Sequence, residues 1–533
     1  MIVLIHSKCQ KVVRVLKGEA EINISATQCT KALWELAEIF PDEIVVWCEK
    51  EFENELNFVY YPEIFHHDLI MASYAIKTEY LPDAIGYIDQ LPFVNVNQKL
   101  QYPTWRMSAD VGGIKGKTLL KFKNLLSNIE DLNLVLNSIA KLGQQHGLFC
   151  YSSPLLIKEG ISSSNFKIKT TASKKELFSF VYLHYKGIRT WLLLWCFIKY
   201  ENSFPLEAFL LAILKRKYFK EEMDFSDIKV ESIRPSKNLR TFDVLIPTLG
   251  RKKYLLQVLE DLKFQSLLPN KVIIVEQNPD PDSQTELQEL KEKNWPYKII
   301  HHFTHRTGAC NARNIGLAEV EADWIFFADD DIRIAPDVLA KSIAEIGRLG
   351  VYCLNINCRQ EGEATVFHKI KQWGSFGSGT SIVKTEFCKN LAFDEVFEYG
   401  FGEDIDYGMQ LRNAGCDIIY HPELEILHLK APRGGFREIR SAPWEEDQPK
   451  PSPTLMVYAS KYYTHEQLRG FKNELFLRYY FKQEINNPFN YLKMMRKRWG
   501  KSEEWADKLM QSNEVKDERE GKESRITNQE SRS

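Results

Sequence analysis

The feature that most constrains the fold is a series of apolar runs between Phe242 and Asp331. Four of them read FDVLIP, KVIIVEQ, YKIIHH and WIFFADD, and each is followed by a polar or helical stretch. Alternation of short β-like runs with helical segments is typical of βαβ units, which build a largely parallel sheet covered by helices. The sequence therefore predicts an α/β unit that begins near residue 239.

Pattern and composition divide the chain into five regions. Residues 1–160 alternate β-like runs (IVLI, EIVVWCE) with helix-like ones and predict another α/β domain, and 161–238 predict a helical linker rich in aromatic residues. The second α/β unit spans 239–440, and residues 441–502 return to a helical pattern. From 503 to 533 the chain is charged and poor in aromatics, which predicts a disordered tail.

Composition excludes several classes of protein. A mean hydropathy of -0.34 and the absence of an apolar run near the roughly 20 residues that cross a bilayer argue against an integral membrane protein. A net charge of -2 gives no reason to expect a nucleic-acid partner. Ten cysteines without a CxxC pair indicate reduced thiols, as in a cytoplasmic protein.

Polar residues follow the predicted strands of the second unit. Pro247 and Thr248 end the first run and Arg251 opens the next helix, while Glu276 ends the second run. Arg313 lies at the start of a helix that leads into the fourth run. Ligands of open α/β sheets bind beyond the carboxyl ends of the strands, so these side chains are candidates for one binding site.

Three consecutive aspartates, Asp329, Asp330 and Asp331, end the fourth run. Adjacent carboxylates raise one another's pKa unless a cation or hydrogen bonds compensate. A divalent cation typically binds one or two carboxylates together with substrate phosphates, and it stabilises a diphosphate leaving group. These residues alone leave two interpretations open, a solvated turn or a cation site for a nucleotide diphosphate.

Glu403 and Asp404 precede an amphipathic stretch in GFGEDIDYGMQLRNAG. A carboxylate near an acceptor hydroxyl can remove its proton during attack, whereas two acids at a helix start are also favoured by the helix dipole. Further upstream, GSFGSGTSIV at 374–383 supplies glycines where the backbone passes close to donor or acceptor, or else forms an ordinary loop.

His428 ends another apolar run, and Lys430 and Arg433 follow it where they can meet a diphosphate. Gly434 and Gly435 come next and would give a closing lid its hinge. A lone histidine is more often structural than a ligand, so this segment by itself does not decide between the two roles.

The ordered set PTLGR, VE, GACNARNIGL, FFADDD and GFGEDIDYGMQLRNAGCDIIYHPELEILHL resembles family 2 glycosyltransferases over about residues 240–435. The resemblance implies a GT-A-type nucleotide-diphospho-sugar transferase fold, with a Rossmann-like, mixed and mostly parallel sheet. It implies an inverting transfer from a nucleotide-sugar, expected to be UDP-linked, to a hydroxyl of a glycan or lipid-linked glycan. It also implies a divalent cation, Mn²⁺ or Mg²⁺, and a role in assembling bacterial surface polysaccharide or lipopolysaccharide.

The resemblance also assigns roles to individual residues. Asp404 would be the general base and Glu403 would contact the acceptor. The family more often has Asp where this chain has Glu276. Asp331 and His428 would bind the metal, and the residues expected to contact the nucleotide-sugar are Pro247, Thr248, Arg251, Glu276, Arg313, Asp329, Asp330, Lys430 and Arg433.

Residues 128–160 repeat the order of features at 402–431: an ED pair, an amphipathic stretch, Gly, a short apolar run, Pro and a strand. In the same comparison Glu49 stands opposite Glu276, and GYIDQ at 86–90 falls where FFADDD would. We hypothesise that residues 1–160 are a degenerate GT-A-like copy without the metal site. Chance similarity between two α/β domains is the alternative.

Two other functions compete with glycosyl transfer. A nucleotidyltransferase acting on sugar phosphates also uses a pair of acids at a sheet edge, but its Gly-rich basic signature is not seen near the N-terminus. A non-catalytic glycan-binding scaffold of two degenerate domains is the other, and intact DDD, ED and His argue against it.

The C-terminal stretch LFLRYYFKQEINNPFNYLKMMRKRWGK mixes aromatic and basic residues. Such a helix either lies on anionic lipid, as a peripheral contact on the inner face of the membrane, or packs on the catalytic domain with a solvated basic face.

Overall fold

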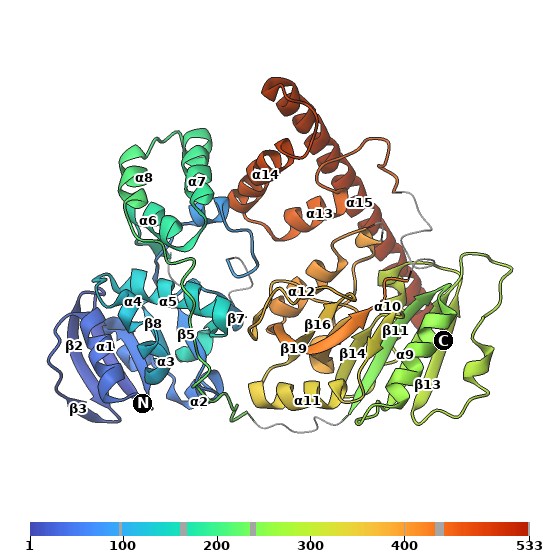
Figure 1. Cartoon of the computed structure of the whole chain (residues 1–533), viewed down its shortest axis with the longest axis horizontal. Coiled ribbons are helices and arrows are strands. Elements are labelled where there is room, and N and C mark those ends of the chain that lie inside the picture. Colours follow the sequence, from blue (N-terminus) through green and yellow to red (C-terminus); the bar gives the residue numbers. More distant parts are fainter. Residues whose placement is uncertain (95–98, 160–167, 235–240, 399, 432–441, 531–533) are drawn as a thin grey trace.

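The computed structural model of this chain describes residues 1–94, 99–159, 168–234, 241–398, 400–431 and 442–530, with side chains up to residue 512. Two large mixed sheets lie side by side, each flanked by helices, and a helical assembly lies at one end of the molecule (Figure 1). The α/β fold class predicted from the sequence is confirmed.

The first sheet has the strand order β3-β2-β1-β4-β8-β5-β9-β7. Its strands are β1 (Ile2–Ser7), β2 (Lys11–Lys17), β3 (Ala20–Ile22), β4 (Ile44–Glu49), β5 (Ile70–Tyr74), β7 (Tyr102–Pro103), β8 (Val111–Lys115) and β9 (Phe149–Ser152). Two further short strands, β6 (Thr78–Glu79) and β10 (Lys169–Thr170), pair with each other. The helices of this part are α1 (Cys29–Ile39), α2 (Tyr61–Ile64), α3 (Gly116–Leu120), α4 (Lys123–Leu126) and α5 (Leu132–His146).

The second sheet has the order β13-β12-β11-β14-β18-β16-β19-β15, and β17 also pairs with β19. Its strands are β11 (Phe242–Leu249), β12 (Lys271–Gln277), β13 (Lys298–Thr304), β14 (Trp324–Ala328), β15 (Ile332–Ile334), β16 (Cys353–Arg359), β17 (Lys371–Gln372), β18 (Thr380–Lys384) and β19 (Ile419–His428). Its helices are α9 (Lys252–Lys263), α10 (Ala309–Leu317), α11 (Val338–Leu349) and α12 (Glu403–Asn413).

The four apolar runs of the sequence form β11 to β14, which lie together and parallel. The rest of the sheet is more mixed than "mostly parallel" suggests. Strand β18 comes from the glycine-rich segment and runs antiparallel to both of its neighbours, β14 and β16. A strand that begins directly after FGSG is hidden from pattern reading, because glycines there suggest a loop.

The two sheets share one strand order over six positions. In the first sheet, β1 and β4 are parallel, β8 is antiparallel to β4 and β5, β9 is parallel to β5, and β7 is antiparallel to β9. The second sheet repeats these directions with β11, β14, β18, β16, β19 and β17. A shared strand order is what the hypothesis of a degenerate copy requires.

The detailed alignment read from the sequence is wrong in two places. Strand β4 corresponds to β14 and not to β12, so the register places Glu49 at the position of Asp329 instead of Glu276. Residues 86–90 lie in and after a short 3₁₀ helix, Asp83–Tyr87, and not at a strand end. Where the second sheet has the parallel strands β12 and β13, the first has the antiparallel strands β2 and β3.

A buried glutamine of β17 joins the two α/β parts. The amide of Gln372 accepts a hydrogen bond from the Cys150 backbone (2.9 Å) and from Gln144 (2.8 Å), and donates to the Cys150 carbonyl (3.2 Å). It also donates to Asp417, at 2.7 Å. Because buried amides are costly to leave unpaired, this network helps to fix the first part against the second.

The other helices lie in the described residues 168–234 and 442–530, in the regions where the sequence predicts helix, 161–238 and 441–502. They are α6 (Lys174–His184), α7 (Gly187–Tyr200), α8 (Leu206–Ile213), α13 (Pro453–Tyr462), α14 (His465–Tyr480) and α15 (Pro488–Glu530). The tail is a correction, since residues 503–530 continue α15 where we expected disorder. Ser502 and Ala506, at the start of this segment, are buried and anchor it to the rest of the protein. The residues that follow are mostly good helix formers.

Candidate active site

The site lies at the carboxyl ends of β11, β12 and β14, opposite the start of α12. Strand β14 is buried along its whole length, so its position between β11 and β18 fixes where the following aspartates begin. The three aspartates then take three different sets of partners.

Asp330 is held by the first strand of the sheet. Its carboxylate accepts hydrogen bonds from the Thr248 hydroxyl (2.8 Å) and from Arg251 (3.0 Å). Burial raises its pKa to about 6, against the opposing effect of Arg251. Asp330 thus positions the segment after β11, and the same Arg251 donates to Asp331 at 3.1 Å.

Asp331 faces the end of β19. One carboxylate oxygen lies 3.2 Å from Nε2 of His428, and the other accepts from the Ala431 backbone N–H at 3.0 Å. Burial alone would raise the pKa of Asp331, but the hydrogen bonds from His428 and Ala431 lower it. The hydrogen bond to Asp331 in turn raises the pKa of His428 to about 10.

Asp329, Asp331 and His428 form a group whose ligand atoms all lie within 4.8 Å of one another. Asp329, which we expected beside the nucleotide-sugar, therefore lies with the two expected metal ligands. Two carboxylates and one imidazole suit a borderline-hard divalent cation such as Mn²⁺. Glycine at position 379 leaves room for the Asp329 carboxylate. A Cβ on Gly379 would lie only 2.1 Å from Oδ2 of Asp329.

Arg313 lies buried in α10 behind this group. Its Nη2 is 3.4 Å from Asp329, and its guanidinium stacks over the Phe393 ring at 5.4 Å. Burial opposes its charge, but Asp329, Asp404 and Glu403 raise its pKa. Among the described residues Nε and Nη1 have no hydrogen-bond partner, so two buried donors remain for an anionic ligand.

Glu403 and Asp404 form the first turn of α12. Asp404 accepts a hydrogen bond from the Ser378 backbone at 3.2 Å, and burial raises its pKa while Arg313 opposes the rise. Burial and the neighbouring Asp404 raise the pKa of Glu403 to about 7. Two carboxyls with elevated pKa values in one site are typical of acid–base groups.

A fully buried aspartate anchors the helix that carries this pair. Asp406 accepts from Lys461 (2.8 Å), Tyr462 (2.9 Å) and Gln410 (2.7 Å). Lys461 and Tyr462 are the last two residues of α13. This C-terminal helix therefore helps to fix the position of the two candidate catalytic acids on α12.

Glu276 of β12 lies next to Thr248 of β11 in the register of these two strands, and Pro247 is the residue before Thr248. Its carboxylate is already engaged by His301 (2.9 Å), the Glu286 N–H (2.8 Å) and Thr285. Burial alone would raise its pKa, but these hydrogen bonds lower it. The structure thus brings Pro247, Thr248 and Glu276 together, with His301 as a neighbour that the sequence did not indicate.

Lys430 and Arg433 are the two residues expected to contact the diphosphate. Lys430 follows β19 with an exposed side chain and a positive φ of 49°. Arg433, together with Gly434 and Gly435, lies outside the described residues.

Sequence reasoning missed Glu398, which organises the start of α10. Its carboxylate accepts from the backbone N–H groups of Asn311 (2.7 Å) and Cys310 (3.2 Å), and a Cβ on Gly308 would lie 2.1 Å from it. An acid at a helix N-terminus is favourable, but these residues are 87 and 88 positions from Glu398 in sequence. No spacing rule relates them; the only local signal was Gly308, whose φ of 152° needs glycine.

Residues 243–397 match the model of Glycosyl transferase family 2. These residues are a family 2 glycosyltransferase domain. The fold predicted from the resemblance, a GT-A-type mixed sheet, is confirmed for this part of the chain. Asp329, Asp330 and Asp331 lie inside the matched residues, whereas Glu403, Asp404 and His428 lie beyond them.

A search of curated proteins returned no match. Among solved structures, the chain is similar to Staphylococcus aureus TarS 1–349, at 20% identity and a TM-score of 0.30 over 36% of this chain and 60% of that one. The complex of TarS 1–349 with UDP-GlcNAc gives 17% identity and 0.33 over 48% and 70%. GalNAc-T7 with UDP, GalNAc and Mn²⁺ gives 15% and 0.32 over 41% and 47%.

The chain therefore spans less than two thirds of the first of these relatives. Similarities this weak carry no conclusion about the ligands of this protein. The family model and the geometry of the described residues define the candidate site.

Proposed function

We propose that this protein is a metal-dependent, inverting glycosyltransferase, with residues 239–440 as its catalytic domain. It would transfer a sugar from a UDP-sugar to a hydroxyl of a glycan or a lipid-linked glycan. The observation that carries the proposal is one arrangement inside or directly beside the family 2 domain: the Asp329, Asp331 and His428 group, with buried Arg313 in contact with Asp329 and interacting electrostatically with Asp404.

The cation, held by Asp329, Asp331 and His428, would neutralise charge that develops on the diphosphate leaving group. Asp330 fixes Arg251 and Thr248, and so shapes the segment that lies along the nucleotide. Arg313 keeps Asp329 in place and offers its two unpartnered donors to the donor substrate. Pro247, Thr248 and Glu276 would contact the base.

Asp404 supplies the base for a single displacement. Its carboxylate takes the proton of the acceptor hydroxyl while the hydroxyl oxygen bonds to the anomeric carbon. The bond from that carbon to the diphosphate oxygen breaks, and UDP leaves with the electron pair on the opposite face, so the configuration inverts. The elevated pKa of Asp404 makes it a better proton acceptor than an exposed aspartate. Glu403, one residue earlier on α12, would contact the acceptor.

The test is UDP release from a panel of UDP-sugars by the full-length protein, with Mn²⁺, Mg²⁺ or a chelator. Turnover should require the metal and should fall sharply in Asp331→Asn and Asp329→Asn. The matched control is Glu49→Gln, because Glu49 holds the position of Asp329 in the first sheet and interacts there with His6 and the Lys8 backbone.

Glu49→Gln should retain wild-type turnover. If no donor releases UDP and Asp331→Asn changes nothing, the proposal fails in favour of a scaffold. Release of pyrophosphate from a nucleoside triphosphate and a sugar phosphate would instead identify a nucleotidyltransferase.

A further inference from the structure

Helices α7 and α8 expose an unusually large apolar surface. Trp191 and Trp195 are 59% and 54% exposed, and Leu214, just after α8, is 81% exposed. The large exposed apolar residues of this α7–α8 surface are Ile188, Trp191, Trp195, Ile198, Phe204, Leu206, Leu210, Leu211, Ile213 and Leu214.

The spacing of these residues shows that they form stripes. On α7 they recur at three- and four-residue intervals, which places them on one side of the helix. The opposite sides are already used for the core: Leu193 and Phe197 of α7, and Phe209 of α8, are buried. Each helix is therefore apolar nearly all round, a pattern typical of helices that have a second apolar neighbour. Contiguous exposed patches of this kind mark interaction sites.

Basic residues surround the surface. Residues 174–220 contain nine lysines and arginines and only three glutamates, whereas the whole chain carries a net charge of -2. Lys186, Lys199, Lys215 and Lys220 are exposed. A cationic rim with interfacial tryptophans complements the anionic headgroups of a phospholipid surface.

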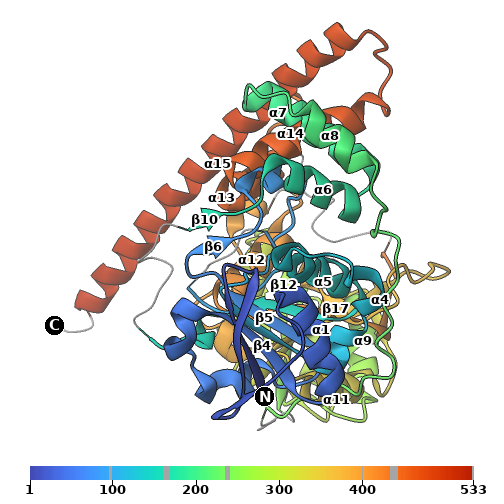
Figure 2. The same ribbon diagram turned by 90° about the vertical axis from the view of Figure 1, so that its left-hand side faces the viewer.

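A second, smaller apolar and basic element lies at the same end of the molecule. The turn from α14 into α15 exposes Phe481 (77%) and Phe489 (82%), next to Lys482 and Lys493. This turn and the α7–α8 surface lie at the upper end of both views (Figures 1 and 2). One side of α15 packs inward, because Tyr491, Met495 and Trp499 are buried.

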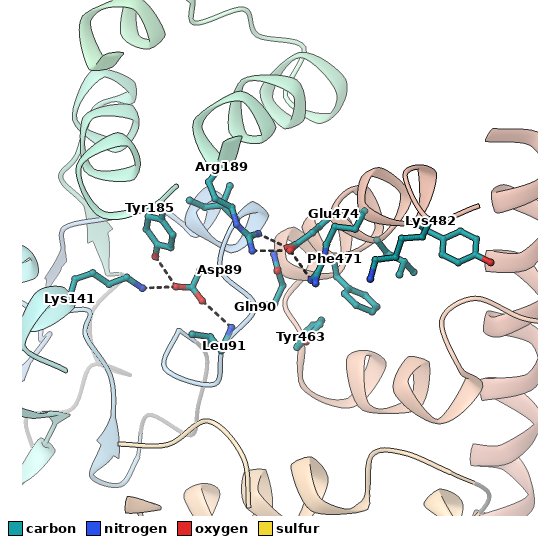
Figure 3. Close-up of a pocket in the computed structure, with 14 residues that line it drawn as sticks. Asp89, Gln90, Leu91, Lys141, Tyr185, Arg189, Tyr463, Phe471, Glu474 and Lys482 are labelled. Carbon is teal, nitrogen blue, oxygen red and sulfur yellow. Dashed lines mark hydrogen bonds and ion pairs between the residues drawn. The ribbon is translucent and has the colours of Figure 1, made fainter. Parts of the chain in front are cut away.

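An ion pair and a hydrogen bond join α7 to the C-terminal helix α14. Arg189 of α7 pairs with Glu474 of α14 through both carboxylate oxygens, and Lys199 donates to Asn473 at 2.9 Å. Figure 3 shows the Arg189–Glu474 pair together with the buried Asp89–Lys141 pair (2.8 Å), and both pairs line a cavity of about 600 Å³. These contacts hold α7 against α14.

We propose that the α7–α8 surface binds an anionic phospholipid bilayer, with both helices lying in the headgroup region. Within the described residues, every helix is too short or too polar to cross a membrane. Helix α7, with 14 residues, is only about 21 Å long, which suits lying on a bilayer. A second copy of the chain fits less well, since a two-fold interface through this surface would bring one basic rim against another.

This proposal is independent of the reaction. Its test is co-sedimentation of the full-length protein with vesicles of phosphatidylglycerol and phosphatidylcholine, compared with phosphatidylcholine alone and with added salt. The variant Trp191→Ser/Trp195→Ser should lower the partition coefficient about tenfold or more. Lys215→Gln/Lys220→Gln should lower it on anionic vesicles only. The matched control is Phe264→Ser, which removes an equally exposed aromatic (66%) from the end of α9.

Salt-sensitive binding to anionic vesicles that is lost in the tryptophan variant and kept in Phe264→Ser supports the proposal. Circular dichroism and UDP-sugar binding should be unchanged in all variants, which shows that they fold. The proposal is overturned if the wild type ignores anionic vesicles, or if the tryptophan variant binds them as well as the wild type. It is equally overturned if sedimentation velocity shows a dimer that the tryptophan variant converts to a monomer.

Discussion

Gly379 gives the sharpest single test of the metal group, because the structure predicts how far one added methyl group moves a ligand. In Gly379→Ala the new Cβ would lie 2.1 Å from Oδ2 and 2.3 Å from Cγ of Asp329. Ordinary contact begins at about 3.4 Å, so the carboxylate has to move by about 1.3 Å. The backbone itself does not oppose the change, since Gly379 is not among the glycines with a positive φ.

A movement of this size takes Asp329 out of the group that it forms with Asp331 and His428. The cost in stability should be small, because the Asp329 side chain is 35% exposed and its contact with Arg313 is long, at 3.4 Å. Metal affinity should fall more, by about 10- to 100-fold, as is typical when the groups that position a ligand are disturbed. Gly374→Ala is the matched control, since its Cβ would meet only ordinary contacts at 3.8 Å.

The assay is calorimetric titration of Mn²⁺ into the wild type and the two variants, followed by UDP release at saturating metal. In an Asp329→Ala background, Gly379→Ala should have no further effect, because the clash has been removed. Wild-type Mn²⁺ affinity in Gly379→Ala would refute the reasoning, and so would an equal loss in Gly374→Ala.

Three further predictions concern individual carboxylates. Asp404→Asn should lower kcat by about 10² to 10⁴ with little change in UDP-sugar affinity, and the acid limb of the wild-type pH–rate profile should lie above the usual aspartate pKa, because burial raises the pKa of Asp404. Asp406→Ala should cost about 2 to 3 kcal/mol of unfolding free energy in urea, because it removes the hydrogen bonds that Lys461, Tyr462 and Gln410 donate to this buried carboxylate, while Lys461 keeps its pair with Asp394. Glu345 has a pKa of about 2, held below the usual 4.5 by His421 and Arg348 in spite of burial. Because the pKa of Glu345 is lower in the folded than in the unfolded protein, its ionised form stabilises the fold at any pH above the unfolded pKa of about 4.5. This contribution should be lost as the pH falls from about 4.5 to 2, and acid unfolding of Glu345→Gln should lack that loss.

The predictions from sequence succeeded where the signal was local. Strands β11 to β14 were visible as apolar runs, and the residues after them, Thr248, Glu276 and Asp330, do meet at one edge of the sheet. Parallel strands bring their carboxyl ends together whatever the loops between them do, so the location of the site followed from periodicity.

Predictions failed where two segments distant in sequence had to be compared. Glu49 was placed opposite Glu276, because EIVVWCE and KVIIVEQ look alike, but pairing with β1 and β8 places it at the position of Asp329. Strand identity in a sheet depends on neighbours, and a pattern of apolar residues does not carry that information. Likewise, Glu398 and Gly379 had no signal of their own, since each acts on a residue 50 or more positions away.

The sequence by itself determined an α/β chain with an acidic strand end, an ED pair before a helix and a histidine at the end of a strand. These features depend on local periodicity and on residue type, which are the same whatever the tertiary structure is. Only the tertiary structure decided how the three aspartates divide their roles, with Asp330 turned to Thr248 and Arg251, and Asp329 and Asp331 turned to His428. It also decided that the apolar run of α7 has one buried and one exposed side, because burial is a property of the neighbours that packing supplies.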